Sequence, residues 1–400
     1  MVGLVFGYSC SAYGNYLNLV ALSLYTLAVT GGAFGVGVVM ASRLAAGFCA
    51  GLVAGRLVTR FDRRRLMIGT DLIQALAMVL LAIGPRSTPL LVGVAVVLGA
   101  GNTLFVVALR SSVPELVGQD RRVRANGWLV TGRSLGTVLG FGSAGVVIAV
   151  GGFTAAFLLN AVSFLVSAAT LVRLRAHTGG SRETPGDRPV RGRLLTLVGP
   201  VVAVMVVVRG GDAFGSASHN MALPLYANQL DPAEPAFVMS QFWASWAVGS
   251  LLAYQLVRRR QGVGERGFVL ATAVMSVSFV LAFAVPAGPA LMAVAVVAGL
   301  ADGCAEIVYT ARLQAAPDEL RGRLFALSAI AETSGFATGM VASAALLEAL
   351  PPLTVVAVFH GVTLLGAVLL AVVLMRRTSM RRADASQTAG DVRRAAPGAH

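Results

Sequence analysis

The sequence predicts an all-α integral membrane protein with twelve transmembrane helices in two pseudo-symmetric halves of six. Of its 400 residues, 56% are hydrophobic and only 12% are charged, whereas soluble chains carry about 25% charged residues. Apolar runs of roughly 20 residues, the length that crosses a bilayer, recur along the chain. The basic residues gather in alternate loops between these runs, which is typical of a multi-pass membrane protein.

The apolar runs form two groups of six. The first group covers residues 3–29, 32–58, 66–85, 89–113, 125–149 and 152–174, and the second covers 195–229, 236–257, 267–286, 289–313, 323–347 and 353–375. A stretch rich in Gly, Pro and Arg lies between the groups and predicts a linker. We expect an N-terminal half at 1–174, a cytoplasmic linker at 175–194, a C-terminal half at 195–376 and a disordered cytoplasmic tail at 377–400.

The arginines predict the orientation in the membrane. They concentrate in the even-numbered loops, the linker and the tail, while the odd-numbered loops hold only Arg86. The positive-inside rule therefore predicts a multi-pass protein of the cytoplasmic (inner) membrane with both termini in the cytoplasm. The net charge of +14 does not indicate a nucleic-acid partner, because these residues sit in short loops and not on one exposed basic face.

Cofactor and enzyme chemistry have no support in the sequence. Cys10, Cys49 and Cys304 lie far apart inside apolar runs and lack the spacing of metal ligands. The chain contains no lysine, so it has no glycine- and lysine-containing loop that would hold the phosphates of ATP. We expect no cofactor, no metal site and no enzymatic activity.

The two halves resemble each other in sequence. The segment AGLVAGRLVTR at 50–60 aligns with GSLLAYQLVRR at 249–259, and RSSVPEL at 110–116 aligns with RLQAAPDEL at 312–320. Two six-helix repeats related by an axis along the membrane normal form a known transporter plan, with the substrate held between the halves.

The twelve spans, the central linker and the basic loop after span two resemble the major facilitator superfamily. The loop GRLVTRFDRR resembles the signature G-x-x-x-D-R-x-G-R-R, and RFDRRRLM resembles the branch of enterobactin exporters and macrolide-efflux proteins. PELVGQDRRVRANG at 114–127 and PDELRGRLFAL at 317–327 are similar to that branch too. The resemblance implies a cytoplasmic gating motif made of Gly55, Thr59, Arg60, Asp62, Arg63, Arg64 and Asp71. Thr59 replaces the signature's acidic residue, so a rewired or weakened latch is expected.

A run of glycines in span five has two interpretations. Its sequence GRSLGTVLGFG resembles the superfamily's antiporter signature G-x-x-x-G-P-x-x-G-G, with Thr137 in place of the proline and Phe141 in place of a glycine. The spacing is equally typical of close packing between helices. The residues concerned are Gly132, Gly136, Gly140 and Gly142.

Ionisable residues inside the spans predict the functional site, because each costs roughly 2.5–3.5 kcal/mol on insertion scales. Arg209 and Asp212 of span seven are spaced to form an ion pair, which is the alternative, purely structural interpretation. We interpret the acidic groups as sites of proton coupling, with Asp212 and Glu306 as the leading residues. The other members of this set are Asp302, Glu332 and His219.

Polar side chains at helical spacing on span one predict a wall of a central cavity. Tyr8, Ser11, Asn15, Asn18 and Tyr25 share this stripe, which would be wasted against lipid. Further residues expected to face the substrate are Arg43, Arg209 and Tyr309. Trp243 and Trp246 of span eight suit either the cavity or the membrane interface, and we favour the interface.

These features predict a proton-coupled secondary transporter that exports a small organic compound by alternating access. Its partners would be that substrate, protons and the lipid bilayer, and we expect a monomer. An importer of the same fold is one alternative. A sensor or scaffold without transport activity is another, and the charges clustered within the spans speak against it.

The predicted topology can be tested with single cysteines at Gly186 in the linker and Ala233 in the seventh loop, in a background without the native cysteines. A membrane-impermeant thiol reagent added to intact cells should label the Ala233 position and miss the Gly186 position. Labelling of both positions from outside would overturn the arrangement.

Overall fold

The structure, a computed structural model, describes residues 2–117, 122–173, 200–259, 264–316 and 318–395. Within these ranges every regular element is a helix, so the predicted fold class is confirmed. The N-terminal half contains α1 (Val2–Thr30), α2 (Ala33–Arg60), α3 (Arg63–Ile83), α4 (Thr88–Val117) and α5 (Arg122–Val172). The C-terminal half contains α7 (Pro200–Leu230), α8 (Pro235–Arg259), α9 (Glu265–Ala282), α10 (Pro289–Gln314), α11 (Asp318–Leu346) and α12 (Pro352–Ala395). The predicted linker at 175–194 lies outside the described residues.

The fifth and sixth predicted spans are joined in one element, α5. Its helical conformation is interrupted at Gly152, which has a φ of 68°. This left-handed conformation favours glycine because glycine has no Cβ to clash with the backbone. The break lets the chain reverse without a loop, so that two spans follow each other directly.

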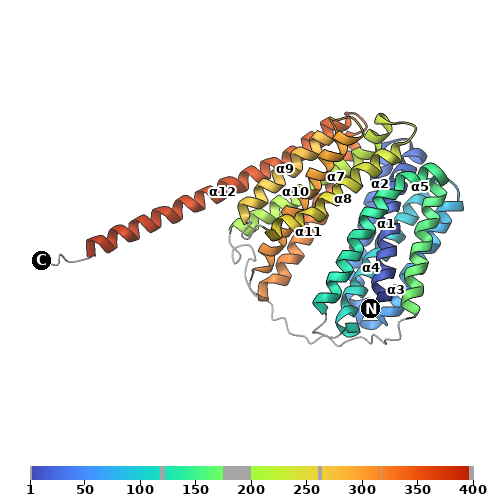
Figure 1. The fold of residues 1–400 in the computed structure, drawn as a ribbon, viewed down its shortest axis with the longest axis horizontal. Helices are drawn as coiled ribbons and strands as arrows, with labels where there is room; N and C mark the ends of the chain where they lie inside the picture. Colours follow the sequence, from blue (N-terminus) through green and yellow to red (C-terminus); the bar gives the residue numbers. More distant parts are fainter. Residues whose placement is uncertain (1, 118–121, 174–199, 260–263, 317, 396–400) are drawn as a thin grey trace.

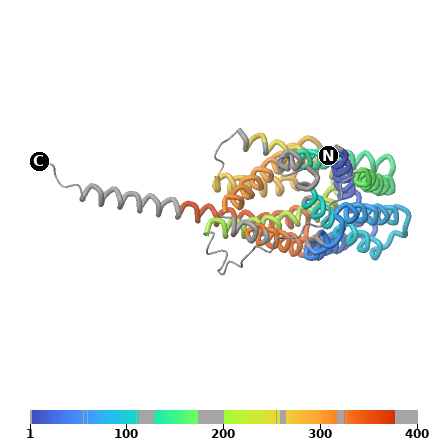
Figure 2. The backbone as a smooth tube through the Cα atoms, turned by 90° about the horizontal axis from the view of Figure 1, so that it is seen from below, coloured from blue at the N-terminus to red at the C-terminus, as the bar shows by residue number. Residues whose placement is uncertain are grey.

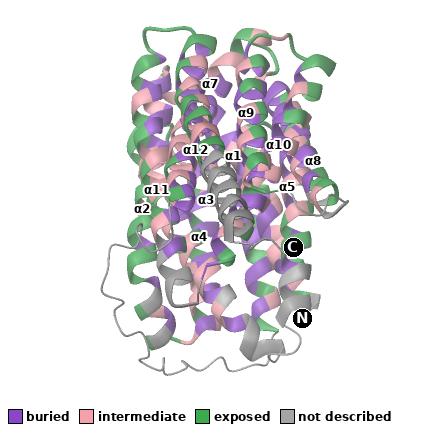
Figure 3. Cartoon of the chain, turned by 90° about the vertical axis from the view of Figure 1, so that its left-hand side faces the viewer, coloured by how far each residue is buried: buried purple, intermediate pink, exposed green. Residues whose placement is uncertain are grey.

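The helical bundle has the surface of a membrane protein. Nine of the described helical segments are long and apolar enough to span a bilayer, among them the 45-residue segment Trp128–Val172 that holds two spans. Exposed residues lie mainly on the outside of the bundle (Figure 3), and many of them are large and apolar, such as Leu52, Ile83 and Val150. So large an apolar outer surface is explained by contact with lipid.

The two halves repeat the same helix pairings. In the N-terminal half, α1 packs against α5, α2 against α4, and α3 against α4 and α5; in the C-terminal half, α7 packs against α11, α8 against α10, and α9 against α10 and α12. The halves form two adjacent bundles (Figures 1 and 2). The sequence alignment of the halves is therefore matched by a common packing plan.

The tail differs from its expected disorder. The helix α12 continues beyond the last predicted span to Ala395 (Figure 1). The segment after Arg376 is rich in arginine and alanine, which rank among the strongest helix formers.

The halves contact each other mainly at one end of the bundle. This far end holds the turn after Thr30, the break at Gly152 and the turn after Leu346, whereas the linker end holds Val172 and Pro200. At the far end, the Phe34 amide donates to Glu348 Oε1 at 2.9 Å, and the Gly145 amide donates to Ser240 Oγ at 2.6 Å. The halves diverge toward the linker end (Figure 1), so this conformation is closed at the far end.

Glycines allow the closest helix contacts inside each half. A Cβ added at Gly140 of α5 would lie 2.5 Å from the Tyr13 carbonyl oxygen of α1, and one added at Gly136 would lie 2.8 Å from the Ser9 carbonyl oxygen. In the C-terminal half, a Cβ at Gly339 of α11 would lie 2.5 Å from the Phe214 carbonyl oxygen of α7. The same backbone contact thus recurs at the equivalent helix pair.

Two glycines of the span-five run should respond differently to alanine. Gly140→Ala places a methyl group against the α1 backbone and should lower the stability by about 1–3 kcal/mol. Gly142→Ala is the matched control, because its nearest neighbour would be Ala244 Cβ at 3.8 Å. Thermal unfolding of the purified variants in detergent measures the difference, and equal stabilities would contradict close packing as the role of Gly140.

Candidate functional site

A cavity of about 690 Å³ lies between the two halves. From the N-terminal half it is lined by α1, α2, α4 and α5, including Tyr16, Arg43 and Phe141, and from the C-terminal half by α7 to α11. Its volume suits a small organic molecule. Both Trp243 and Trp246 line this cavity, so the expectation that they anchor at the membrane interface was wrong. Trp243 stacks on Phe141 of the other half, with ring centroids 5.4 Å apart.

One arginine in the cavity wall is surrounded by four carboxylates. Arg209 Nη1 donates to Asp212 Oδ2 at 2.7 Å and lies 3.9 Å from Asp302 Oδ1. Its Nη2 donates to Glu306 Oε2, and its Nε lies 3.9 Å from Glu332 Oε2. Helices α7, α10 and α11 therefore contribute to one ionic cluster, which we call the Arg209 cluster: Arg209, Asp212, Asp302, Glu306 and Glu332.

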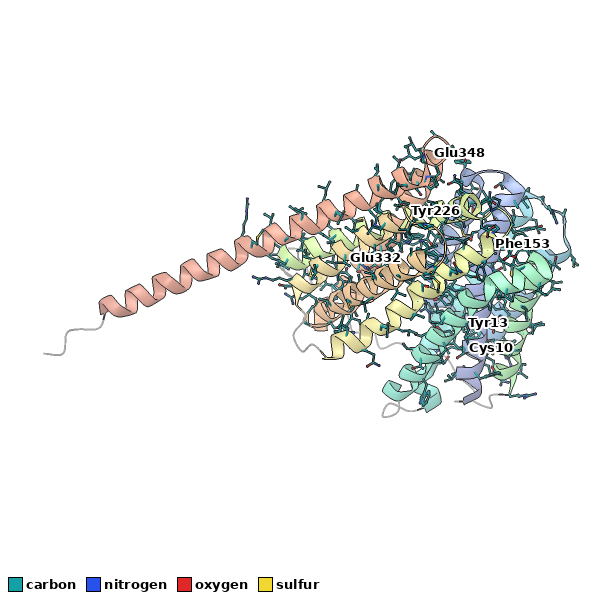
Figure 4. All side chains as sticks on the ribbon, turned by 45° about the horizontal axis from the view of Figure 1, so that its top comes forward. Cys10, Tyr13, Phe153, Tyr226, Glu332 and Glu348 are labelled. Carbon is teal, nitrogen blue, oxygen red and sulfur yellow. The ribbon has the colours of Figure 1, made fainter. Side chains whose placement is uncertain are left out.

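Hydrogen bonds extend the Arg209 cluster along α10 and α11. Tyr309 Oη lies 2.7 Å from Ser328 Oγ, which donates to Glu332 Oε1 at 2.5 Å. The Arg209 guanidinium also lies over the Tyr309 ring, 5.9 Å from its centroid, at a distance that allows a cation–π interaction. Tyr309 is buried behind the cluster and is not part of the cavity lining. Figure 4 shows Glu332 within the C-terminal half, well away from Glu348 at the far end.

The carboxylates of the Arg209 cluster differ in access to solvent. The Asp212 side chain is 6% exposed and its Oδ1 has no hydrogen-bond partner, whereas the Glu306 side chain is 52% exposed. Asp212, Asp302 and Glu332 line the cavity with Arg209, and Glu306 approaches the arginine from outside the lining. One guanidinium cannot neutralise four ionised carboxylates, so the fully ionised cluster carries three excess negative charges in a medium where charge is costly.

His219 belongs to a buried pair that the sequence analysis missed. Its Nδ1 lies 3.1 Å from His360 Nε2 of α12, and its ring stacks on Phe279 with centroids 3.7 Å apart. His219 also lines the cavity. His360 was overlooked because it is the only ionisable residue of its span and has no charged neighbour at helical spacing.

The polar stripe of span one is divided among three environments, so its assignment to the central cavity was wrong. Tyr8, Ser11 and Asn15 line a separate cavity within the N-terminal half. Asn18 is fully buried with both side-chain polar atoms unpaired, and Tyr25 packs on Phe153 and Phe157. The face of α1 that reaches the central cavity instead carries Tyr16, Leu19 and Ser23, which lie slightly rotated from the predicted stripe.

The predicted gating motif stabilises the linker end of its own half. Asp62 caps α3 by accepting from the Arg65 amide at 2.8 Å. Arg63 donates to the Ser111 carbonyl oxygen of α4 at 2.7 Å, and Arg64 donates to the Leu171 carbonyl oxygen of α5 at 2.8 Å. Such cation-to-carbonyl bonds suit the C-terminal ends of helices.

The remaining motif residues separate into two groups. Arg60 is exposed beside the Phe61 ring, and Gly55 and the Thr59 side chain lie on a part of α2 whose surroundings are outside the described structure. Asp71 is 1% exposed inside α3 and lines the separate cavity of the N-terminal half. Asp71 therefore lies inside the bundle, whereas the family resemblance had assigned it to the cytoplasmic gating motif.

Comparison with known proteins agrees with this architecture. A profile described as the Major Facilitator Superfamily matches residues 4–311. Three solved structures are similar over 93–94% of this chain: the nucleoside transporter NupG (13% identity, TM-score 0.70, 98% of that chain covered), the POT family transporter PepTSo (13%, 0.74, 98%) and a bacterial homologue of the human lysosomal transporter Spinster in an inward-facing conformation (14%, 0.68, 94%). A search of curated proteins finds no match.

The structural likeness, at identities this low, concerns the fold. The profile covers more than half of the chain, and the paired bundles and the cavity between them fit the architecture it describes. The chain therefore belongs to the Major Facilitator Superfamily of membrane transporters.

Proposed function

We propose that the protein is a proton-coupled exporter of small organic compounds in the cytoplasmic membrane, working by alternating access. The observation that carries this proposal is the Arg209 cluster, in which one cation faces four carboxylates beside the central cavity. An uncompensated carboxylate within a membrane is costly. Bound protons remove the excess negative charge, and a cationic substrate can take their place.

The cavity lining supports a hydrophobic substrate with a basic nitrogen. Asp212, Asp302 and Glu332 offer negative charge on one wall, while aromatic and methionine side chains form much of the remainder. Aromatic rings attract organic cations, and flexible methionines adapt to different shapes. We therefore favour a drug or natural product of this kind as the substrate.

The contacts between the halves support a rocking mechanism. The present conformation is joined at the far end by the Phe34–Glu348 and Gly145–Ser240 hydrogen bonds. With the linker end in the cytoplasm, this state faces inward and receives substrate from the cell. Opening outward requires these bonds to break and the halves to approach each other at the linker end.

Neutral variants of two carboxylates test the coupling. Asp212→Asn and Glu306→Gln should lower proton-driven transport at least tenfold while expression stays near normal, because each keeps the side-chain shape and removes the titrating group. Uptake of ethidium into inverted vesicles under an imposed pH gradient measures this effect. Glu234→Gln, on an exposed loop, is the matched control and should transport normally. Wild-type coupling in both test variants would assign the proton to another site.

The direction of transport is tested in cells. Inward proton movement supplies about 2.3 kcal/mol per charge per 100 mV, so exchange of protons for substrate drives export. Cells that express the protein should accumulate less ethidium than cells with the Asp212→Asn variant, and a protonophore should abolish the difference. If expression instead raises proton-dependent accumulation of substrates, the protein is an importer.

A further inference from the structure

The N-terminal half contains a second cavity, of about 340 Å³, that the proposed transport site does not explain. It is lined by residues of α1, α2, α3, α4 and α5. We call it the N-terminal chamber and define it by Asn15, Arg43, Asp71, Gln74, Asn102 and Arg133. Tyr16, Arg43, Asn102 and Thr103 line both this chamber and the central cavity, so the two spaces are neighbours with a shared wall.

Buried polar atoms without hydrogen-bond partners gather around this chamber. They are Asn15 Oδ1, Arg43 Nη1, both carboxylate oxygens of Asp71 and Gln74 Oε1. Ser167 of α5 approaches the Asp71 carboxylate but completes no hydrogen bond of normal geometry. Each buried polar group left unpaired costs about 1–3 kcal/mol. Such a concentration of unpaired groups around one space indicates that the space holds a polar ligand.

Water is the ligand that this lining suits. The chamber has room for several water molecules, since each occupies about 30 Å³ of liquid volume. The unpaired atoms include acceptors on Asn15, Asp71 and Gln74 and a donor on Arg43. A water molecule can donate to the three acceptors and can accept from the Arg43 guanidinium. A bare cation would satisfy the oxygens alone and would be repelled by Arg43 and Arg133.

Three of the helices that line the chamber with α3 contribute ionisable side chains around Asp71. The facing ionisable groups are Tyr8 and Tyr16 of α1, Arg43 of α2 and Arg133 of α5, while α4 contributes the neutral Asn102. Arg133 is engaged with Tyr16, whose hydroxyl accepts from its Nε at 3.2 Å and its Nη2 at 3.0 Å. Asp71 forms no ion pair within 4 Å among the described side chains, so its charge is neither neutralised by direct contact nor open to bulk water.

We propose that Asp71 is a reversible proton-binding site of the N-terminal half, served by water in the N-terminal chamber. The carboxylate accepts a proton from a chamber water, which is reprotonated through the central cavity, and the same route returns the proton. Ionised Asp71 attracts the Arg43 guanidinium toward the chamber, and protonated Asp71 leaves Arg43 available to the central cavity. Proton binding here would therefore alter the charge presented to the substrate.

Infrared difference spectroscopy of the purified wild-type protein, titrated from acidic to alkaline pH, tests this proposal without any transported compound. The wild type should show a protonated-carboxyl band that appears on acidification and shifts in heavy water. Asp71→Asn should lose that one band. Asp62→Asn is the matched control from the same segment, and it should leave the band unchanged. Because no transport is measured, the result is independent of the proposed export function.

Two further measurements test the proposal even if the Asp71→Asn variant folds poorly. Arg43→Gln, with Asp71 intact, should shift the pH midpoint of the Asp71 band, because a facing positive charge is removed. The titration is then repeated with sodium replaced by choline, which should change nothing. Any one of four results would overturn the proposal. These are a band retained in Asp71→Asn, the absence of a pH-dependent band in the wild type, an unshifted midpoint in Arg43→Gln, and titration only in the absence of sodium.

Discussion

The imbalance of charge around Arg209 is the constraint on which the proposed transport function of this bundle depends. A single guanidinium is shared by carboxylates from α7, α10 and α11. Holding such a set together inside a membrane protein, with Asp212 almost fully buried, is unfavourable unless protons or a cationic ligand balance the charge. In the proposed mechanism this imbalance makes the cluster responsive, because a proton and a positively charged substrate would each reduce the same excess negative charge and would therefore compete.

The rest of the fold places this cluster in one wall of the cavity between the two halves. Glycines bring α1 against α5 and α7 against α11 at backbone contact, so each half is a tightly packed unit. The halves contact each other mainly at the far end, where Glu348 and Ser240 accept hydrogen bonds from backbone amides of the other half. Two closely packed halves that meet mainly at one end, through apolar as well as polar contacts, suit the proposed rocking motion.

The sequence predicted the fold well, because bilayer spans impose length and composition on every helix. It also singled out the charged residues that the structure brings together around Arg209, because such residues are costly in a membrane. Spacing along one helix was sufficient to suggest the Arg209–Asp212 contact. It was insufficient for contacts between helices, because the convergence of Asp302, Glu306 and Glu332 on Arg209, like the His219–His360 pair, depends on tertiary packing.

The polar stripe of α1 and the tryptophans of α8 were misplaced because periodicity identifies a helix face without saying which neighbouring helix that face meets. Asp71 was misplaced because its motif begins in a loop and continues into a buried helix.

The central claim is that protons and a cationic substrate compete for the Arg209 cluster, and it is tested most directly by measuring proton release on binding. Purified protein in weakly buffered detergent solution, with a pH-sensitive dye, should release protons when tetraphenylphosphonium is added near neutral pH. The release should be largely lost in the Asp212→Asn, Glu306→Gln double variant and retained in Glu234→Gln. Binding of the cation by the wild-type protein with no release of protons across the pH range would contradict the account.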